Sequence, residues 1–213
     1  MEKVFVGRRV VITGPSKSII GQGQGKLIDS YDLVVRVNWQ WPIMEEHIPD
    51  LGRRMDVLYH CTKNEPYARP FHDFFSIPEF HKVALVCYVG HQRDGSEFKD
   101  LLERANVPHE DLSPLCNELR STVCDELNTG YVAIKHLLKQ PLKELYVTGF
   151  TFHREPYYER YCTANWWDRD GRFNSRGKPE VLLADFKREC QSDSRIKLDK
   201  ALKSIVYEEC KLL

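Results

Sequence analysis

Two apolar, β-branched runs with a polar turn between them constrain the possible folds of this chain more than any other sequence feature. The first run ends at Ile12 and leads into the turn of residues 13–16, and the second spans residues 33–37 and stops at Asn38. This order predicts a buried parallel strand, a turn, a connection and a second strand. Such a turn presents backbone N–H groups at the carboxyl edge of a sheet, where open α/β folds bind ligands and anions in particular.

Two common phosphate-binding motifs do not fit the segment between these runs. A dinucleotide fingerprint needs G-x-G-x-x-G directly after the strand, whereas Gly21, Gly23 and Gly25 come later and have a different spacing. A P-loop needs Ser or Thr after its lysine, but Leu27 follows Lys26. The turn must therefore be interpreted without either motif.

Other apolar patterns predict the remaining elements of an α/β fold. We expect strands at 56–59, 83–89 and 145–147, and helices at 96–106, 131–138, 178–190 and 195–212. A segment rich in proline and aromatic residues, 63–81, is expected to be irregular with a short helix. Together these elements predict one domain over residues 1–213, a three-layer α/β sandwich with a mostly parallel, twisted sheet.

Composition narrows the class of protein. The 31 basic and 31 acidic residues balance, so the sequence lacks the global basic field that favours nucleic acid or an anionic membrane. It also has no signal-peptide core and no uninterrupted apolar run of membrane-spanning length, which predicts a soluble protein without a membrane segment. Seven scattered cysteines without metal spacing predict free thiols.

Two separated stretches resemble the motifs of one enzyme family. The turn Gly14-Pro15-Ser16, the segment 28–32 and the triplet 36–38 occur in the order of the L motif of the eukaryotic-type sialyltransferases. Residues 127–152 are similar to the S motif of that family, in which a small polar pair and a glycine open a helix. The turn also resembles G-N-G-P-S of the bacterial sialyltransferases, with Thr13 in place of the asparagine.

The resemblance implies a donor-binding site. It places the CMP moiety at the residues that follow the first strands and the donor carboxylate or phosphate at the start of the helix near 129. A helix N-terminus suits such an anion because its N–H groups are unpaired and its dipole is positive. The substrate-binding candidates are Thr13, Gly14, Pro15, Ser16, Asn38, His60, Thr129 and Gly130.

Residues 153–159 are similar to the third family motif, H-Y-Y-[DE], although Pro156 stands in place of the histidine. The resemblance implies that Tyr157 and Tyr158 stabilise the departing phosphate, which hydroxyl donors do well. His153 is the candidate base, because an imidazole titrates near neutral pH. Asn174 occupies the region where the bacterial relatives have their histidine base, so the base could also be lost or replaced.

The function implied is inverting transfer of sialic acid, Kdn or Kdo from a CMP-sugar to a glycan hydroxyl, on a modified Rossmann-like fold of the GT-A-type variant. The family works without metal, and we interpret the D-x-D at 168–170 as a solvated turn, so we expect no cofactor beyond the CMP-sugar co-substrate. The partners are then the CMP-sugar and a glycan acceptor, without nucleic acid. The disulfide that joins the L and S motifs in the family cannot form here, because residues 9–38 contain no cysteine, which fits a reducing compartment and hence the cytoplasm. The Golgi lumen replaces the cytoplasm if a membrane anchor was trimmed away.

Two alternatives remain open from the sequence. Asn174 and Pro156 are compatible with a catalytically silent protein that binds CMP or a nucleotide sugar on the same fold. A generic nucleotide-binding α/β protein would follow if both motif matches arose by chance. Binding of CMP separates this last alternative from the others, and turnover separates the first two.

Overall fold

The computed structural model describes residues 2–38, 40–62, 71–89, 95–159, 161 and 178–208. Within these ranges the chain forms a seven-stranded sheet in the order β5-β4-β3-β2-β1-β6-β7, and every neighbouring pair is parallel. The strands are β1 (Arg9–Thr13), β2 (Leu33–Val37), β3 (Val57–His60), β4 (Leu85–Tyr88), β5 (His109–Asp111), β6 (Glu144–Thr148) and β7 (Ile196–Leu198). The order reverses between β1 and β6, where open α/β folds bind ligands.

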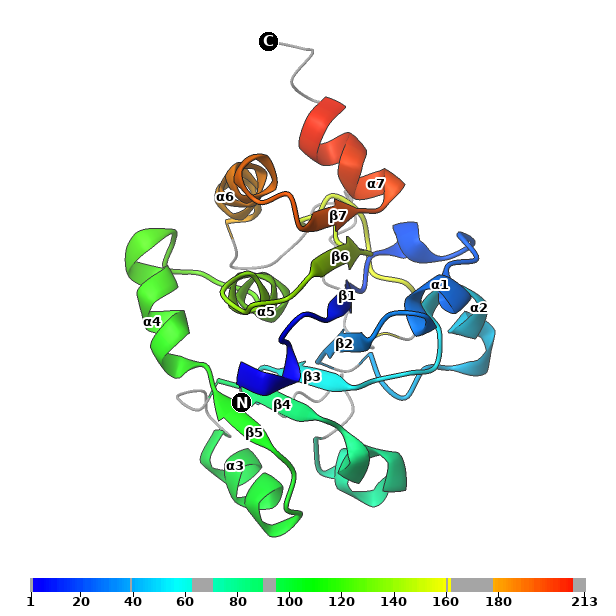
Figure 1. Cartoon of the computed structure of the whole chain (residues 1–213), viewed down its shortest axis with the longest axis vertical. Coiled ribbons are helices and arrows are strands. Elements are labelled where there is room, and N and C mark those ends of the chain that lie inside the picture. Colours follow the sequence, from blue (N-terminus) through cyan, green and yellow to red (C-terminus); the bar gives the residue numbers. More distant parts are fainter. Residues whose placement is uncertain are drawn as a thin grey trace.

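Helices cover both faces of the sheet, as Figure 1 shows, with α4, α5 and α6 on one side and α1 and α2 on the other. The helices are α1 (Gly25–Asp29), α2 (Ile48–Leu51), α3 (Gly95–Arg104), α4 (Ser113–Thr122), α5 (Thr129–Leu138), α6 (Pro179–Ser192) and α7 (Lys200–Lys203). None of the helices in the described ranges is long and apolar enough to cross a bilayer. The expected three-layer α/β sandwich with a parallel sheet is confirmed.

Alternation along the strands explains the two layers of core. In β1, Val10 and Ile12 pack in the cluster that contains α5 and α6 residues, whereas Val11 packs against Ile28 and Leu51 on the opposite face. Because successive strand side chains point to opposite faces, a run of buried β-branched residues needs helices on both sides. All of these side chains are fully buried.

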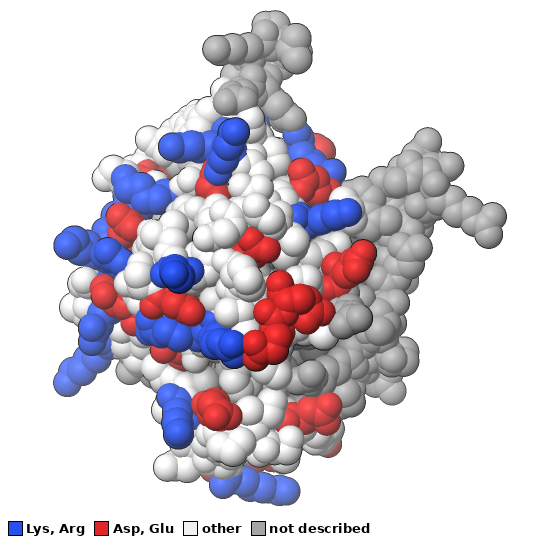
Figure 2. Space-filling model, turned by 90° about the vertical axis from the view of Figure 1, so that its right-hand side faces the viewer, with Lys and Arg blue, Asp and Glu red and all other residues white. Residues whose placement is uncertain are grey.

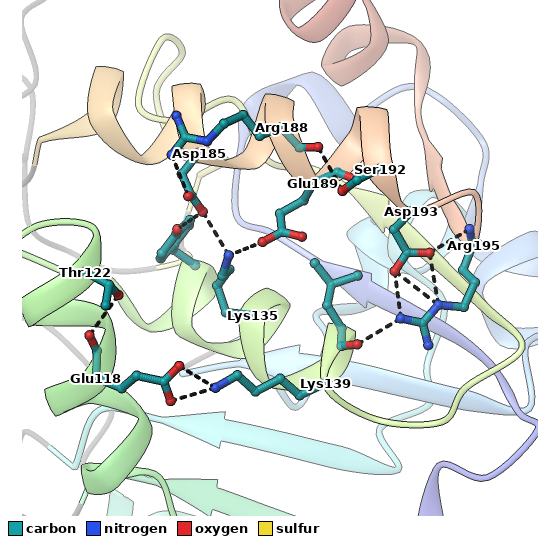
Figure 3. Close-up of polar contacts among 12 residues, drawn as sticks. Glu118, Thr122, Lys135, Lys139, Asp185, Arg188, Glu189, Ser192, Asp193 and Arg195 are labelled. Carbon is teal, nitrogen blue, oxygen red and sulfur yellow. Dashed lines mark hydrogen bonds and ion pairs between the residues drawn. The ribbon is translucent and has the colours of Figure 1, made fainter.

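Polar contacts tie α6 to α5 (Figure 3). Lys135 of α5 contacts both Asp185 and Glu189 of α6, and the Tyr131 hydroxyl donates to the same Asp185 carboxylate. Figure 3 also shows Arg195 paired with Asp193 just beyond α6. Since Asp185 and Lys135 are largely shielded from solvent, these contacts hold α6 in one register on α5.

The expected helix over 195–212 is wrong at its beginning. Ile196–Leu198 forms the edge strand β7, which pairs with β6. Asp199 then ends the strand and caps α7, because its carboxylate accepts a hydrogen bond from the backbone N–H of Leu202 at 2.7 Å. Strand β5 and helix α4 were not predicted at all.

His60, a predicted substrate-binding residue, lies in the hydrophobic core. Its imidazole is fully buried, with ring centroids 5.7 Å from Phe74 and 5.1 Å from Phe98. The Nδ1 atom accepts a hydrogen bond from the N–H of Thr62 at 3.0 Å. Burial disfavours the charged form and lowers the pKa of His60 to about 3.

This buried imidazole is expected to make the protein less stable in mild acid. Since the folded pKa of about 3 lies below the ordinary value of 6.5, the unfolded chain binds more protons between these values, and acidification favours unfolding. We expect His60 to remove roughly 1.5–2 kcal/mol of unfolding free energy between about pH 6.5 and about pH 5. Urea denaturation of the wild type and of His60→Phe across this window measures it. Equal slopes against pH would contradict the assignment.

Candidate active site

A cleft with about 620 Å³ of empty space, open solvent included, lies at the carboxyl ends of β1, β2 and β6, beside the start of α5. The residues predicted from sequence that line it are Pro15, Ser16, Asn38, Thr129, Gly130, His153 and Tyr157. Thr13, Gly14, His60 and Tyr158 were also predicted, and they are not among its lining residues. Segments far apart in the sequence thus meet in one place.

The floor of the cleft is formed by a close approach of the turns that follow β1 and β6. The N–H of Gly14 donates to the carbonyl of Thr148 at 2.7 Å, and the N–H of Ser16 donates to the carbonyl of Gly149 at 2.9 Å. A Cβ atom on Gly14 would overlap the carbonyl oxygen of Gly149, which itself has a φ of +71°. Gly14 therefore acts through the backbone, by letting the two turns touch.

Thr13 lies beneath this turn and is fully buried. Its hydroxyl donates to Oε1 of Gln40 at 3.0 Å and accepts from Nη1 of Arg36 at 3.0 Å. Gln40 in turn donates through Nε2 to the carbonyl oxygen of Gly14 at 2.8 Å. Thr13 thus supports the turn through Gln40, a residue that sequence reasoning missed because nothing around it marks a buried amide. Nearby, Trp41 packs in a hydrophobic cluster of the core and does not line the cleft.

Asn38 ends β2 with a left-handed φ of 51° and lines the cleft. Its backbone N–H donates to the carbonyl of Tyr59 at 2.7 Å, and its side-chain Oδ1 accepts from the N–H of Cys61 at 2.9 Å. Asparagine tolerates this backbone region better than most residues. The contacts to the segment around β3 hold the side-chain amide at the mouth of the cleft.

Helix α5 presents its N-terminus to the cleft. The side chain of Asn128 caps it by accepting a hydrogen bond from the N–H of Tyr131 at 2.8 Å. Thr129 and Gly130 occupy the first turn, where backbone N–H groups have no acceptor within the helix. The positive end of the helix dipole therefore faces the cleft and favours an anion there.

His153 lies half-buried in the cleft just after β6, with a left-handed φ of 61°. Burial lowers its pKa to about 4, so the imidazole is neutral at pH 7. Its Nε2 atom is 3.5 Å from Nδ2 of Asn128, the residue that caps α5. A neutral imidazole can accept a proton, but the lowered pKa makes it a weaker base than an exposed histidine.

The two neighbouring tyrosines point to different places. Ser16 and Tyr157 form an antiparallel bridge, and the N–H of Tyr158 donates to the carbonyl of Pro15 at 3.0 Å. Because side chains alternate along such an extended pair, Tyr157 lines the cleft. Tyr158 is buried on the other side, with its ring centroid 5.1 Å from that of His47.

Glu155 is a cleft residue that the sequence analysis did not assign. Its Oε2 atom accepts a hydrogen bond from the Ser16 hydroxyl at 3.2 Å, and the Thr151 hydroxyl donates to the same Ser16 oxygen at 3.2 Å. Its position in the segment that follows β6, a strand that ends at the ligand edge, is the available signal. The other unassigned lining residues are Val37, Asn128, Tyr131, Ile134, Gly149, Phe150, Thr151, Phe152 and Tyr161.

Charges of both signs occur on the surface of the molecule (Figure 2). On the face shown in Figure 2, acidic and basic side chains both occur, with a group of acidic ones near the centre. The part of the chain that the structure describes contains no group of three His, Cys, Asp or Glu residues arranged to hold a metal. The D-x-D at 168–170 and Asn174 lie outside the described residues, so those interpretations stay predictions.

No protein-family model matches the sequence, and no curated protein matches it. Solved structures do match its fold. A mammalian sialyltransferase in complex with Gal-beta-1-3GalNAc-ortho-nitrophenol has a TM-score of 0.56 and 13% identity, over 93% of this chain and 71% of that one. The sialyltransferase CstII from Campylobacter jejuni, in complex with the substrate analogue cytidine-5'-monophosphate, has a TM-score of 0.55 and 13% identity, over 91% of this chain and 79% of that one. The chain therefore has the fold of the sialyltransferases, as its two sequence motifs predicted.

Proposed function

We propose that this protein is an inverting glycosyltransferase that moves sialic acid, or a relative such as Kdn or Kdo, from a CMP donor to a glycan hydroxyl. The observation that carries the proposal is the convergence of residues from three separate motifs on one cleft. The turn after β1, the N-terminus of α5 and the segment after β6 all line it. The shared fold supports the same interpretation, since one neighbour was solved with cytidine monophosphate.

The residues divide the work in a way that suits this reaction. Ser16 and Asn38 would hold the nucleotide, while Thr129 and Gly130 would bind the donor carboxylate or phosphate at the positive end of α5. The Tyr157 hydroxyl would donate to the leaving phosphate as negative charge develops on it. We propose that these neutral donors take the place of a divalent metal.

His153 is the proposed general base in this scheme. It would accept the proton of the acceptor hydroxyl while that oxygen bonds to the anomeric carbon and CMP departs with the bonding electron pair. Its lowered pKa makes this a weak base, but a tertiary anomeric centre ionises readily, and positioning can supply much of the catalysis. The same low pKa favours the second candidate function, a silent protein that binds CMP or a nucleotide sugar.

The decisive experiment measures CMP release from CMP-Neu5Ac, CMP-Kdn and CMP-Kdo, with and without galactosyl acceptors, beside calorimetry with CMP. Parallel reactions with chelator and with added Mg²⁺ or Mn²⁺ test the metal independence. Release from one donor would support the transferase and name the sugar. Binding of CMP without release from any donor would favour the silent protein. Absence of CMP binding would overturn both.

The split between the tyrosines yields a matched pair of variants. Tyr157→Phe is expected to lower turnover by roughly 10- to 100-fold with little change in CMP affinity, because a hydroxyl donor to the developing charge is lost. Tyr158→Phe is the control, since its side chain lies outside the cleft lining. Steady-state kinetics and calorimetry on both variants measure this. A larger loss in Tyr158→Phe would reverse the assignment of the two hydroxyls.

A further inference from the structure

A second hollow opens to solvent beside the cleft, and we refer to it as the β7 hollow. It has about 720 Å³ of empty space, open solvent included, and lies where β1, β6 and β7 end. Its polar lining comes from Ser18, Gln22 and Gln24 after β1, Glu155 after β6, and Asp199, Lys200 and Ser204 after β7. None of these residues except Glu155 also lines the cleft.

The cleft and the β7 hollow meet at a small group of hydrogen-bonded side chains. Ser16 lines the cleft and Ser18 lines the hollow, and their hydroxyl oxygens are 3.0 Å apart. Glu155 lines both spaces and accepts from the Ser16 hydroxyl at 3.2 Å. A ligand in the hollow would therefore have one end next to whatever occupies the cleft.

The wall of the hollow is held rigidly from behind. Asp199 accepts hydrogen bonds from the Thr148 hydroxyl and from the N–H of Gly149, both at 2.8 Å, and also caps α7. On the opposite wall, the Tyr146 hydroxyl donates to Oε1 of Gln24 at 2.7 Å. This contact fixes the Gln24 amide and leaves its NH₂ group as the donor to a ligand.

The chemistry of this lining suits a neutral, hydroxyl-rich molecule. Amide and hydroxyl side chains can both donate to and accept from sugar hydroxyls. Two carboxylates and one ammonium group give the lining a net negative charge, which disfavours a second anion beside Glu155. The cleft lining carries the same net charge, but it also contains the N-terminus of α5, which favours an anion, so the donor fits the cleft and a neutral ligand fits the hollow.

We propose that the β7 hollow binds a neutral glycan as the acceptor and that Glu155 receives a hydrogen bond from a sugar hydroxyl next to the one to be glycosylated. This inference rests on the proposed transferase function, because it names the acceptor site of that reaction. Glu155 then acts as a positioning residue that brings the acceptor to the boundary with the donor. The hollow determines acceptor choice, and the cleft determines donor choice.

Binding can be located directly by NMR of the ¹⁵N-labelled chain. Lactose and N-acetyllactosamine serve as neutral probes and 3′-sialyllactose as the anionic probe, each titrated to millimolar concentration with CMP present. We expect the neutral sugars to shift the side-chain amides of Gln22 and Gln24. Ala201→Trp, which fills the hollow, should abolish these shifts, whereas Lys203→Trp places the same bulk on the exposed side of α7 and should keep them.

Kinetics provide a second readout that does not depend on the tryptophan variants folding. Gln22→Ala is expected to raise the acceptor KM about tenfold, the effect of one lost hydrogen bond, and to leave CMP affinity and acceptor-free donor hydrolysis unchanged. An unchanged acceptor KM would overturn the inference. So would amide shifts caused by sialyllactose alone, or by none of the three sugars.

The failures of the two proposals are distinguishable. CMP binding and release without sugar-induced shifts at Gln22 and Gln24 would contradict the proposed acceptor site but not the proposed transferase function. Shifts at these amides without any CMP binding would show a glycan site on a protein that is not the proposed transferase.

Discussion

Gly149→Ala is expected to lower the free energy of unfolding by roughly 2–6 kcal/mol and to abolish CMP binding. The residue has a φ of +71°, and an added Cβ would lie 2.5 Å from the carbonyl oxygen of Gly14. An alanine therefore strains its own backbone and also pushes the β1 turn away from the β6 turn. Because that turn forms the floor of the cleft, stability and ligand binding should fail together.

Gly7→Ala is the matched control for this substitution. Gly7 has a φ of +67°, but nothing lies within 4 Å of the position that its Cβ would take. It should therefore show only the backbone strain, about 1–2 kcal/mol, and keep its CMP affinity. Urea denaturation and calorimetry measure both quantities. If the two variants lose equal stability and Gly149→Ala still binds CMP, the close approach of the turns is not what shapes the site.

The parts of the site that could be predicted from sequence are those that one local pattern specifies. Ser16, Thr129 and Gly130 each stand at the end of an apolar run or at the start of an amphipathic helix. Parallel strands bring their carboxyl ends to one edge, so these residues had to come close together. The parallel sheet followed from the same runs, because strands buried on both faces need helices on both sides.

Other features depend on tertiary contacts that no local pattern encodes. His60 ends a strand as Asn38 does, but its ring turns into the cluster that contains Phe74 and Phe98. Tyr157 and Tyr158 are adjacent, and only the bridge between Ser16 and Tyr157 determines which hydroxyl reaches the cleft. A sequence motif identifies both tyrosines but does not specify on which side of the extended segment each side chain lies.

The short strands could not be predicted from the sequence for a related reason. Strands β5 and β7 have three residues each, too few for a period of two to be told from a helical one. They exist because β4 and β6 offer them an edge to pair with. The β7 hollow depends on this edge strand, so the proposed acceptor site could not have been derived from the sequence alone.

Arg36→Leu is expected to cost roughly 2–5 kcal/mol of unfolding free energy and to weaken CMP binding, although Arg36 does not line the cleft. The guanidinium is fully buried and donates to the carbonyls of Leu51 at 2.7 Å and Arg54 at 2.9 Å, besides the Thr13 hydroxyl. Leucine would leave these acceptors without their donor. Burial lowers the pKa of Arg36 to about 10, so removing the charge recovers part of the loss.

We expect Arg36→Leu to weaken CMP binding through the hydrogen bonds beneath the turn that follows β1. Without Arg36, the Thr13 hydroxyl loses its donor, and the Gln40 amide that holds the Gly14 carbonyl loses a fixed neighbour. Arg53→Ala is the control, because its pair with Glu45 is exposed and should contribute nothing measurable. Denaturation and calorimetry on both variants give the answer. If Arg36→Leu is destabilised but binds CMP as the wild type does, the buried arginine stabilises the fold without shaping the nucleotide site.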